Sequence, residues 1–590
     1  MTLYKPKEAT IQGQTRSLNI VSDEQLQSFI RSTLCDIEQL IENKQLTSHS
    51  KPLLVVACGL LAIDLYDIAV QNDMSKSMPK RCDRKDVVII GNGPSAITLS
   101  YILSGNWPYW NGCAMSNEYL NIKLEQFVKD NSLLEQDLEL LSDGLEGRTR
   151  NPIALLLDFL LHPDADLGTN SPTKLNWKHV SNQHIDHVCI GRGTPGGVWN
   201  KLTSQHLSTV SLANWMELPN YSFSEFRQSR RSSSNENSDI QQHQQDSKRA
   251  TYDEVRHYYK DYVRRRQLQK NFLNNREVTS IQRVCAEPAY YDEVKDEIHP
   301  TELLWEIRGY KTDKEQTPFC LHAKHVVLAT GTTQEQTRSL NIVSDEQPQS
   351  FIKSTLCDIE QLIENKQLTS HSKPLLVVGC GLSAIDVILL CEKYSIPVMH
   401  VFRKAIDDPD LVFNKLSSNL YPDYEKLYEK MKHAIKQQQQ QLANTQKSSP
   451  LYQCFHQCDI ISINEHSTVI RDLKLSTKAQ LVQYEYDISY AVKLTGPEIK
   501  LNFFENNGQY LATNKTKTLQ SNDNPISINP ITYECTAYEN LYAIGPLVGD
   551  NLIRFLQGGA CAVAASLLKK LKPTSRKRSI TGATILSRHR

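Results

Sequence analysis

"DVVIIGNGPSAITLSYILSG", residues Asp86–Gly105, is the stretch that decides the fold. Its apolar, β-branched beginning predicts a buried parallel strand, and Gly91, Gly93 and Ala96 follow in the spacing G-x-G-x-x-A before a helical pattern starts. These small residues permit a tight turn, the close approach of a pyrophosphate and tight packing of helix on strand. The first amides of the helix also favour a bound phosphate. The stretch therefore predicts a unit that binds a dinucleotide.

A second fingerprint of this kind lies far along the chain. After the apolar run PLLVV, Gly379, Gly381 and Ala384 repeat the spacing G-x-G-x-x-A. The chain has 590 residues, which is more than one core of about 250 to 300 residues can hold. We therefore predict an α/β protein with more than one folded unit, in which both fingerprints bind nucleotides.

A long stretch of the chain is present twice. Gln14–Asp64 returns as Gln336–Asp386 with four differences, and two of these place Ala57 and Leu61 in the glycine turn of the outer copy. A Cβ at a turn position that favours glycine meets steric resistance, so we predict that only the inner copy binds a nucleotide. We interpret residues 1–84 as an added segment and not an independent domain, produced either by a partial duplication or by an error in the predicted gene.

The usual partner of the first fingerprint is missing. An acidic residue normally follows it by about 20 residues, at the end of the next strand, and binds the ribose. Here that spacing falls in Asn106–Met115, which we do not expect to form a strand. The next plausible strand is His187–Gly193, after an insertion of roughly 80 residues, and no Asp or Glu ends it. The sequence therefore predicts no ribose carboxylate.

Further motifs resemble a known family. Gly196, Gly197 and Trp199 form a GGxW element after this strand, WMELPNY follows, and LYAIGPLVGDN lies near the C-terminus. With the first fingerprint, these motifs resemble the flavin-containing monooxygenases and, more closely, the oxidative stress-induced growth inhibitor family, over about 86–572. The resemblance implies that the first unit binds FAD, with the GGxW backbone and its Trp beside the flavin.

The resemblance also implies an order of domains. An ATG stretch, Ala329–Gly331, stands where such proteins leave the flavin domain for the nicotinamide domain. Gly545 and Asp550 follow an apolar strand late in the chain, and the resemblance places them at the flavin. We therefore expect two Rossmann-like domains, with an NADPH domain inserted in a discontinuous FAD domain. The expected limits are 85–335 for the first FAD segment, 336–530 for the NADPH domain and return segment, 531–572 for the second FAD segment, and 573–590 for a basic tail.

The choice of coenzyme depends on the strand that follows the second fingerprint. Within Ile396–Phe413 this strand ends at Arg403 and Lys404. NADP sites place basic side chains here for the 2′-phosphate, whereas NAD sites place a carboxylate for the ribose. We predict NADPH, and the alternative is that both cations are a solvated strand end.

The implied reaction is a monooxygenation. NADPH would reduce bound FAD, and one oxygen atom of dioxygen would pass to a substrate that the sequence does not identify. The wider family places an Asn after the GGxW element; Asn214 is the candidate here, although an ungapped comparison points to Leu212, which would favour peroxide release. The first alternative is a catalytically decayed regulator of growth that acts through protein partners. A flavin disulfide reductase would need a redox Cys pair, and Cys454 and Cys458 are spaced poorly for that role.

Composition excludes other classes. Sixty-six basic and sixty-six acidic residues argue against nucleic-acid binding, and no apolar run approaches the roughly 20 residues that span a bilayer. Fourteen Cys without a framework and the absence of a hydrophobic leader favour the cytoplasm, while the basic tail leaves nuclear access open. We predict no metal site. The polar stretches Gln228–Arg249 and Lys436–Ser449 are expected to be loops, and Tyr258, Tyr259 and Tyr262 to pack on one helix face.

Overall fold

A computed structural model describes residues 82–572 with gaps. The gaps are at 170, 203–207, 234–248, 288–289, 293–296, 300–301, 338–350, 410, 416–420, 442–450 and 477–479. The outer copy of the repeat, with Ala57 and Leu61, and the basic tail lie outside the described residues. The expectations for them therefore stay predictions.

The larger sheet has a parallel centre. Its first strand, β1, ends in the apolar run Val87–Ile90, whose side chains are at most 3% exposed, as is usual for a strand covered on both faces. In the order of the sheet, the parallel strands are β7 (Phe272–Leu273), β4 (His187–Ile190), β1 (Asp83–Ile90), β12 (Pro318–Leu328) and β23 (Leu541–Ala543). Antiparallel strands β11 (Glu302–Lys311) and β8 (Arg276–Glu287) extend it.

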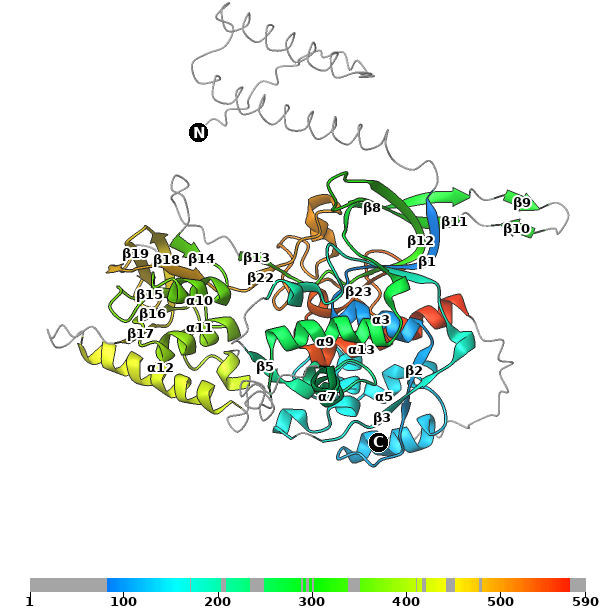
Figure 1. The fold of residues 1–590 in the computed structure, drawn as a ribbon, viewed down its shortest axis with the longest axis horizontal. Helices are drawn as coiled ribbons and strands as arrows, with labels where there is room; N and C mark the ends of the chain where they lie inside the picture. Colours follow the sequence, from blue (N-terminus) through cyan, green and yellow to red (C-terminus); the bar gives the residue numbers. More distant parts are fainter. Residues whose placement is uncertain are drawn as a thin grey trace, which may run out of the picture. The chain divides into compact units, whose positions relative to one another are not determined.

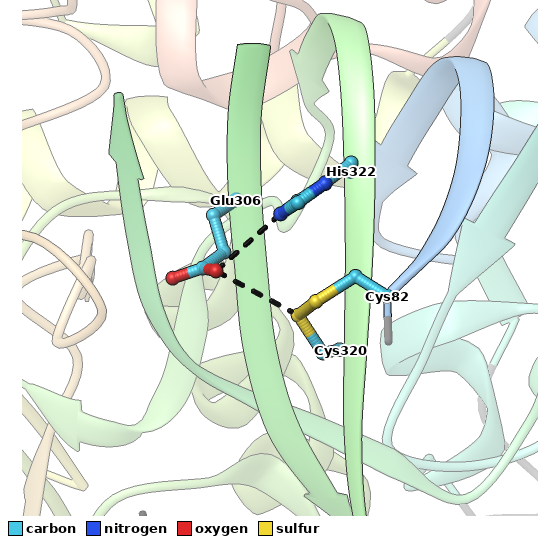
Figure 2. Close-up of side chains that lie close together, drawn as sticks. All are labelled: Cys82, Glu306, Cys320 and His322. Atoms are coloured by element: carbon cyan, nitrogen blue, oxygen red, sulfur yellow. Dashed lines mark hydrogen bonds and ion pairs between the residues drawn. A yellow bond between two sulfur atoms is a disulfide. The ribbon is translucent and has the colours of Figure 1, made fainter. Parts of the chain in front are cut away.

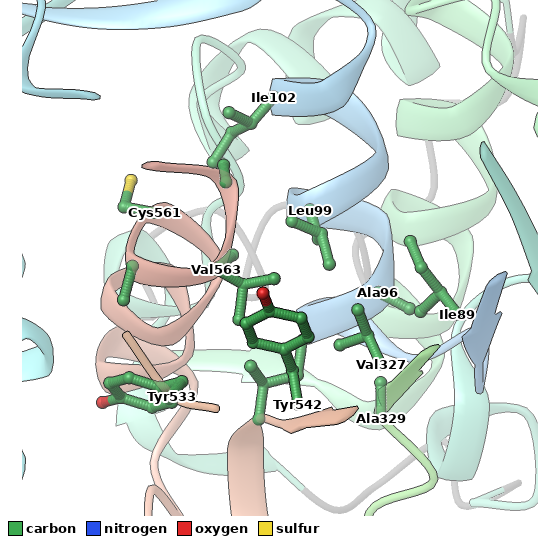
Figure 3. Packing of buried hydrophobic residues seen from close by; sticks show 14 of the residues in the cluster. Ile89, Ala96, Leu99, Ile102, Val327, Ala329, Tyr533, Tyr542, Cys561 and Val563 are labelled. Atoms are coloured by element: carbon green, nitrogen blue, oxygen red, sulfur yellow. The ribbon is translucent and has the colours of Figure 1, made fainter. Parts of the chain in front are cut away.

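The chain returns to this sheet after a long excursion. Strand β23 pairs with β12, and the last helix, α13 (Ile553–Leu571), packs against α3 (Pro94–Leu103) and α6 (Pro152–Leu161). Figure 1 shows β23 and α13, near the red end of the colour bar, among elements from the blue and green regions. Figure 3 shows Val563 of α13 directed toward Leu99 of α3. Two separated chain segments thus build one hydrophobic core.

The smaller sheet is inserted between β12 and β23 and is parallel throughout. In order, its strands are β17 (Tyr452–Phe455), β16 (Val398–Val401), β15 (Leu375–Val378), β21 (Ala491–Lys493) and β14 (Ile352–Lys353). Its helices are α10 (Leu356–Glu364), α11 (Leu382–Lys393) and α12 (Pro422–Gln441). In both sheets the strand before the glycine turn is central: β1 has β4 beside it, and β15 has β16 beside it. The predicted fold class, with one Rossmann-like unit inserted in another, is confirmed, whereas the residue limits of the domains stay predictions.

The insertion after α3 contains a strand that we did not expect. Asn106–Trp110 forms β2, which pairs antiparallel with β3 (Leu175–His179) in a separate two-stranded sheet. Its aromatic side chains suit a half-buried strand, and this preference outweighs the Pro within it. The expectation of no strand at 106–115 was therefore wrong. The expectation that the second parallel strand begins at His187 is confirmed by the pairing of β4 with β1. The same insertion contains α4 (Glu118–Lys123), α5 (Leu138–Ser142) and α6.

The remaining strands form small antiparallel units. They are β5 (Ser208–Leu212) with β6 (Arg249–Thr251), β9 (Tyr290–Asp292) with β10 (Glu297–His299), β13 (Thr333–Thr337) with β22 (Pro497–Glu498), and β18 (Cys458–Ile463), β19 (Ser467–Asp472) and β20 (Gln483–Asp487) together. Residues 228–233 belong to helix α7 (Phe223–Ser233), and 436–441 continue α12, so the starts of both polar stretches are helical and not loops. No helix in the described ranges is both long and apolar enough to cross a membrane.

Candidate cofactor site

The first glycine turn connects β1 to α3 and requires a residue without a Cβ. Gly91 has φ +131°, and a Cβ built on it would lie 2.2 Å from the backbone oxygen of Ala329, at the end of β12. Its amide donates to the oxygen of Ile190 on the other side, at 2.7 Å. The turn is thus wedged between two parallel strand ends. Ala96 of α3 is completely buried, as its predicted packing role requires.

The GGxW element closes over this turn. The amide of Gly196 donates to the oxygen of Asn92 at 2.9 Å, and a Cβ on Gly197 would lie 2.9 Å from the Cα of Gly93. The ring of Trp199 packs edge to face against the rings of Tyr252 and Tyr259, with centroids 5.7 and 6.4 Å away. Two motifs about a hundred residues apart in sequence therefore form one backbone surface.

The C-terminal motif reaches the same place. Gly545 has φ +73°, and a Cβ on it would lie 2.8 Å from Oγ of Ser95, in the first turn of α3. Helix α3 begins with Gly93 as its N-cap, and within the described residues no side-chain hydrogen bond caps this end of the helix. Gly93, Gly197 and Gly545 thus lie close together around the N-terminus of α3.

The Asp550 carboxylate is directed away from this surface into the core. It is completely buried, and it accepts hydrogen bonds from Thr149 Oγ1 at 3.0 Å, Asn151 Nδ2 at 2.8 Å and the Tyr533 hydroxyl at 2.9 Å. Burial raises the pKa of this carboxyl to about 7, although the three hydrogen bonds lower it. The geometry does not favour direct contact between this side chain and a cofactor. It fits a residue that ties the C-terminal motif to the segment before α6.

The second glycine turn repeats the geometry of the first. Gly379 has φ +119°, and a Cβ on it would lie 2.3 Å from the backbone oxygen of Leu494, at the end of β21. Gly381 is the N-cap of α11, which also has no side-chain cap, and no described atom lies within 4 Å of the position of a Cβ on Gly381. Ala384 is completely buried. An alanine at 379, as the outer copy has at Ala57, does not fit this turn.

A pair of threonines marks the strand ends that border the two turns. Thr330 follows β12, and Thr495 follows β21; within the described residues of the chain, the hydroxyl oxygen of each is buried without a hydrogen-bond partner. A buried polar atom without a partner is costly, and a bound polar ligand would relieve the cost. Each threonine is followed by a glycine with positive φ, Gly331 and Gly496. The ATG stretch was recognised in the sequence, whereas the matching LTG at 494–496 is a signal too short to stand out alone.

The role of His400 was not predicted from the sequence either. It is completely buried in β16, with Nε2 2.7 Å from the oxygen of Gly379 and Nδ1 2.9 Å from the hydroxyl of Tyr452. Burial lowers the pKa of this imidazole to about 4, so the ring is neutral near pH 7 and donates from only one nitrogen. The ring therefore fixes the carbonyl of the glycine turn. A single His in an apolar strand gave no sign of this role.

Relatives of known name cover most of the chain. Oxidative stress-induced growth inhibitor 2 of Homo sapiens is 38% identical over 504 residues, covering 82% of this chain and 94% of the relative. Oxidative stress-induced growth inhibitor 1 of Homo sapiens and that of Mus musculus are each 37% identical over 492 residues, covering 82% of this chain and 95% of each relative. The chain belongs to the oxidative stress-induced growth inhibitor family.

Solved structures resemble this family member only distantly. A bacillithiol disulfide reductase from Bacillus cereus has a TM-score of 0.45 and 13% identity, covering 83% of this chain and 100% of that chain. The ornithine hydroxylase of Pseudomonas aeruginosa has a TM-score of 0.44 and 11% identity, with the same coverage. Similarities of this size assign neither a cofactor nor a substrate. No model of a protein family matches the chain.

The basic pair of this growth inhibitor relative lies after β16, as expected. Arg403 is exposed, and its Nη2 lies 2.9 Å from Oδ1 of Asp459 on β18. Lys404 is also exposed, and its Nζ lies 3.7 Å from Oδ1 of Asp408. Both cations therefore have a protein carboxylate beside them, and a phosphate would compete with Asp459 for the guanidinium.

Three tyrosines hydrogen-bond to the backbone of the WMELPNY segment, Trp215–Tyr221. The hydroxyls of Tyr258, Tyr259 and Tyr262 on α9 (Tyr252–Arg265) donate to backbone oxygens within 216–221, and all three side chains are completely buried. The prediction that they pack on one helix face is confirmed. The two candidates for the position of the monooxygenase Asn differ in burial. Leu212 is buried beside Trp215, whereas Asn214 is partly exposed. The catalytic role of Asn214 stays a prediction.

Proposed function

We propose that this growth inhibitor relative is an FAD-dependent, NADPH-using, monooxygenase-like oxidoreductase that acts in growth and stress regulation. The observation that carries the proposal is the repeated geometry of the two glycine turns. Each has a glycine whose missing Cβ lets a strand end pass, an uncapped helix N-terminus, and a buried threonine hydroxyl at the strand end. Two such turns in one chain suit two dinucleotides.

The residues of the first turn would hold the pyrophosphate of FAD. The amides at the start of α3 offer donors and the positive end of the helix dipole, while Gly93 and Gly197 leave backbone within reach. Trp199 is held in place by two tyrosine rings and would fix one side of the flavin site. When bound, FAD supplies electron transfer from NADPH and the activation of dioxygen.

The residues of the second turn would bind NADPH. Gly381 leaves open space above the N-terminus of α11, and His400 holds the Gly379 carbonyl so that it does not turn toward the phosphates. Arg403 would exchange its contact with Asp459 for the 2′-phosphate, because a guanidinium binds either anion through paired N–H donors. The position of Arg403 directly after the second strand of this unit supports NADPH over NADH.

The test is the absorbance spectrum of the purified full-length protein. We expect flavin bands, and we expect NADPH to bleach them under anaerobic conditions faster than NADH does. Absence of the bands, with no flavin uptake when FAD is added, would refute the proposal and favour a regulator that acts through protein partners.

A second measurement separates oxygen transfer from peroxide release. The ratio of hydrogen peroxide formed to NADPH consumed should be well below one if Asn214 serves a monooxygenase role, and Asn214→Leu should raise it. A wild-type ratio near one, unchanged in the variant, would assign an NADPH oxidase activity instead.

A further inference from the structure

Four metal-binding side chains converge at the edge of the larger sheet that lies opposite the glycine turn. They are Cys82, just before β1, Glu306 on β11, and Cys320 and His322 on β12. One donor atom from each lies within 4.8 Å of the donor atoms of the other three. Figure 2 shows the four side chains meeting from three adjacent strands. Cys82 and Cys320 form a disulfide in this structure.

Strand register explains why these residues meet. Glu306 lies directly opposite His322 across β11 and β12, and Arg84 of β1 pairs with the same His322 on the other side. Cys320 and His322 are two positions apart on one strand, so their side chains share a face of the sheet. Glu306, Cys320 and His322 are therefore fixed by paired strands, and Cys82 directly precedes the first paired residue of β1.

The donor set fits a zinc-type divalent ion. Two sulfurs, one imidazole and one carboxylate are ligands that Zn²⁺ accepts in tetrahedral sites, at about 2.0 to 2.3 Å each. The Oε2 atom of Glu306 already lies 3.4 Å from Nε2 of His322 and 3.9 Å from Sγ of Cys320. Ligands of one tetrahedral ion are about 3.3 to 3.8 Å apart at these bond lengths, so small side-chain movements suffice.

The surroundings of the cluster orient Glu306 and balance its charge. Gln282 donates to Oε1 of Glu306 at 2.8 Å, and Arg308 donates to Oε1 at 2.6 Å and to Oε2 at 3.0 Å. Such outer contacts are typical of metal ligands. Two thiolates and one carboxylate around a divalent ion leave one negative charge, which the guanidinium of Arg308 would offset. With the ion bound, the four ligands, the ion and Arg308 have no net charge. Without the ion, the disulfide, the Glu306 carboxylate and Arg308 also have no net charge.

We propose that Cys82, Cys320, His322 and Glu306 form a redox-controlled site for a zinc-type divalent ion, in which the metal and the Cys82–Cys320 disulfide are alternative states. A dithiol reductant supplies two electrons and two protons; the S–S bond breaks, both cysteines become thiols, and the reductant closes its own disulfide. Each thiol then releases a proton as its sulfur binds the ion. Oxidation by a disulfide reverses the exchange and expels the ion.

The site is separate from the cofactor turn. Cys82 directly precedes β1 and Gly91 directly follows it, so nine steps of about 3.3 Å place them roughly 30 Å apart. The disulfide therefore does not act on a bound flavin directly. Cys82 and His322 are only partly buried, which gives an ion and a reductant access. The inference goes beyond the proposed function and does not require FAD or NADPH.

The experiment compares metal content in two redox states of the full-length protein. One sample is reduced with a dithiol, which is then removed, and the other keeps its disulfide; both are dialysed against Zn²⁺ and analysed for metal. We expect the reduced protein to retain one more equivalent of zinc per chain than the oxidised protein. Equal contents would overturn the proposal.

Variants and a second probe identify the ligands. Cys320→Ser and His322→Ala should lose the additional equivalent, whereas Cys285→Ser, which removes an exposed thiol on β8 of the same sheet, should keep it. Gln282→Ala should weaken zinc affinity by about 10- to 100-fold in competition with a chelating dye. Retention of the equivalent by His322→Ala would overturn the proposal.

Cobalt binding gives a result that does not depend on any variant. Reduced wild-type protein with Co²⁺ should show both the visible bands of a tetrahedral ion and a sulfur-to-cobalt charge-transfer band, and oxidised protein should show neither. A reduced protein without these bands would refute the site even if a variant failed to fold.

Discussion

Replacing Gly379 or Gly381 by alanine should separate the two roles of the second glycine turn. Gly379 shapes the turn, because its φ of +119° is rarely adopted by L residues and a Cβ would lie 2.3 Å from the oxygen of Leu494. Gly381 has φ −92° and ψ 179°, an extended conformation that alanine adopts freely, and no described atom lies within 4 Å of its Cβ position. The first change should damage the fold and the second only the binding of a coenzyme.

The size of each effect follows from these contacts. Backbone strain at a disfavoured φ costs about 1 to 3 kcal/mol, and forcing a methyl into a packed contact costs about 1 to 3 kcal/mol more. Gly379→Ala should therefore lower the free energy of unfolding by about 2 to 6 kcal/mol, a large share of the usual 5 to 15 kcal/mol of a domain. Gly381→Ala should leave this free energy unchanged. Its methyl should weaken NADPH binding by about 5- to 150-fold, since it meets the pyrophosphate instead of protein.

Two assays on the same proteins test this. Chemical denaturation followed by circular dichroism gives the unfolding midpoint, and fluorescence titration gives the affinity for NADPH. We expect Gly379→Ala to have a lower unfolding midpoint than wild type. Gly381→Ala should keep the wild-type midpoint but bind NADPH more weakly. A Gly379→Ala protein as stable as wild type would refute the steric argument. A Gly381→Ala protein that binds NADPH normally would show that the pyrophosphate lies elsewhere.

Three further variants test other contacts. Arg403→Ala should weaken NADPH binding by about tenfold and leave NADH binding unchanged in anaerobic titrations. This is the low end for a charge-assisted contact, because the Arg403 side chain is 61% exposed and pairs with Asp459. Equal losses for the two coenzymes would contradict this prediction. Burial raises the pKa of Asp550 to about 7, so folding favours its protonated form and the free energy of unfolding should fall as the pH rises from about 4 to about 7. Asp550→Asn should remove that component from denaturation midpoints across this range, and an unchanged profile would argue against it. Tyr262→Phe should cost about 1 kcal/mol of unfolding free energy, since it leaves the buried oxygen of Pro219 without its donor, and a midpoint equal to wild type would count against this.

Local patterns in the sequence were enough to find both nucleotide turns. Gly91 and Gly379 stand where a strand must reverse into a helix within a few residues, and this requirement is visible in the sequence alone. Strand β4 was also found after a long insertion, because its apolar residues form a continuous run. The pairing of Cys82 with Cys320 was not predictable, since the two are 238 residues apart and only the register of β1 and β12 brings them together.

Side-chain direction was the other limit of sequence reasoning. The resemblance assigned Asp550 to the flavin, but the sequence cannot show that its carboxylate turns inward to Asn151 and Tyr533. Two of its three donors, Thr149 and Asn151, belong to a segment about 400 residues earlier, which is close only in the folded chain. His400 was missed for the same reason, because it acts on the carbonyl of Gly379, which follows another strand. Thr495 was missed because the LTG stretch at 494–496 is too short a signal to stand out alone.

The late return of the chain to its first sheet has a consequence for synthesis. Strand β23 begins about 210 residues after β12 ends, and at about 5 to 20 residues per second a ribosome needs roughly 10 to 40 seconds to make that interval. During this time the apolar faces of α3 and α6 have no α13 to cover them, since Gly558 of α13 packs directly on Ala154 of α6. The nascent chain therefore exposes this apolar surface until α13 has been synthesised, and such exposed surface favours aggregation. A premature stop before Leu541 leaves that core open, however complete the rest of the polypeptide is.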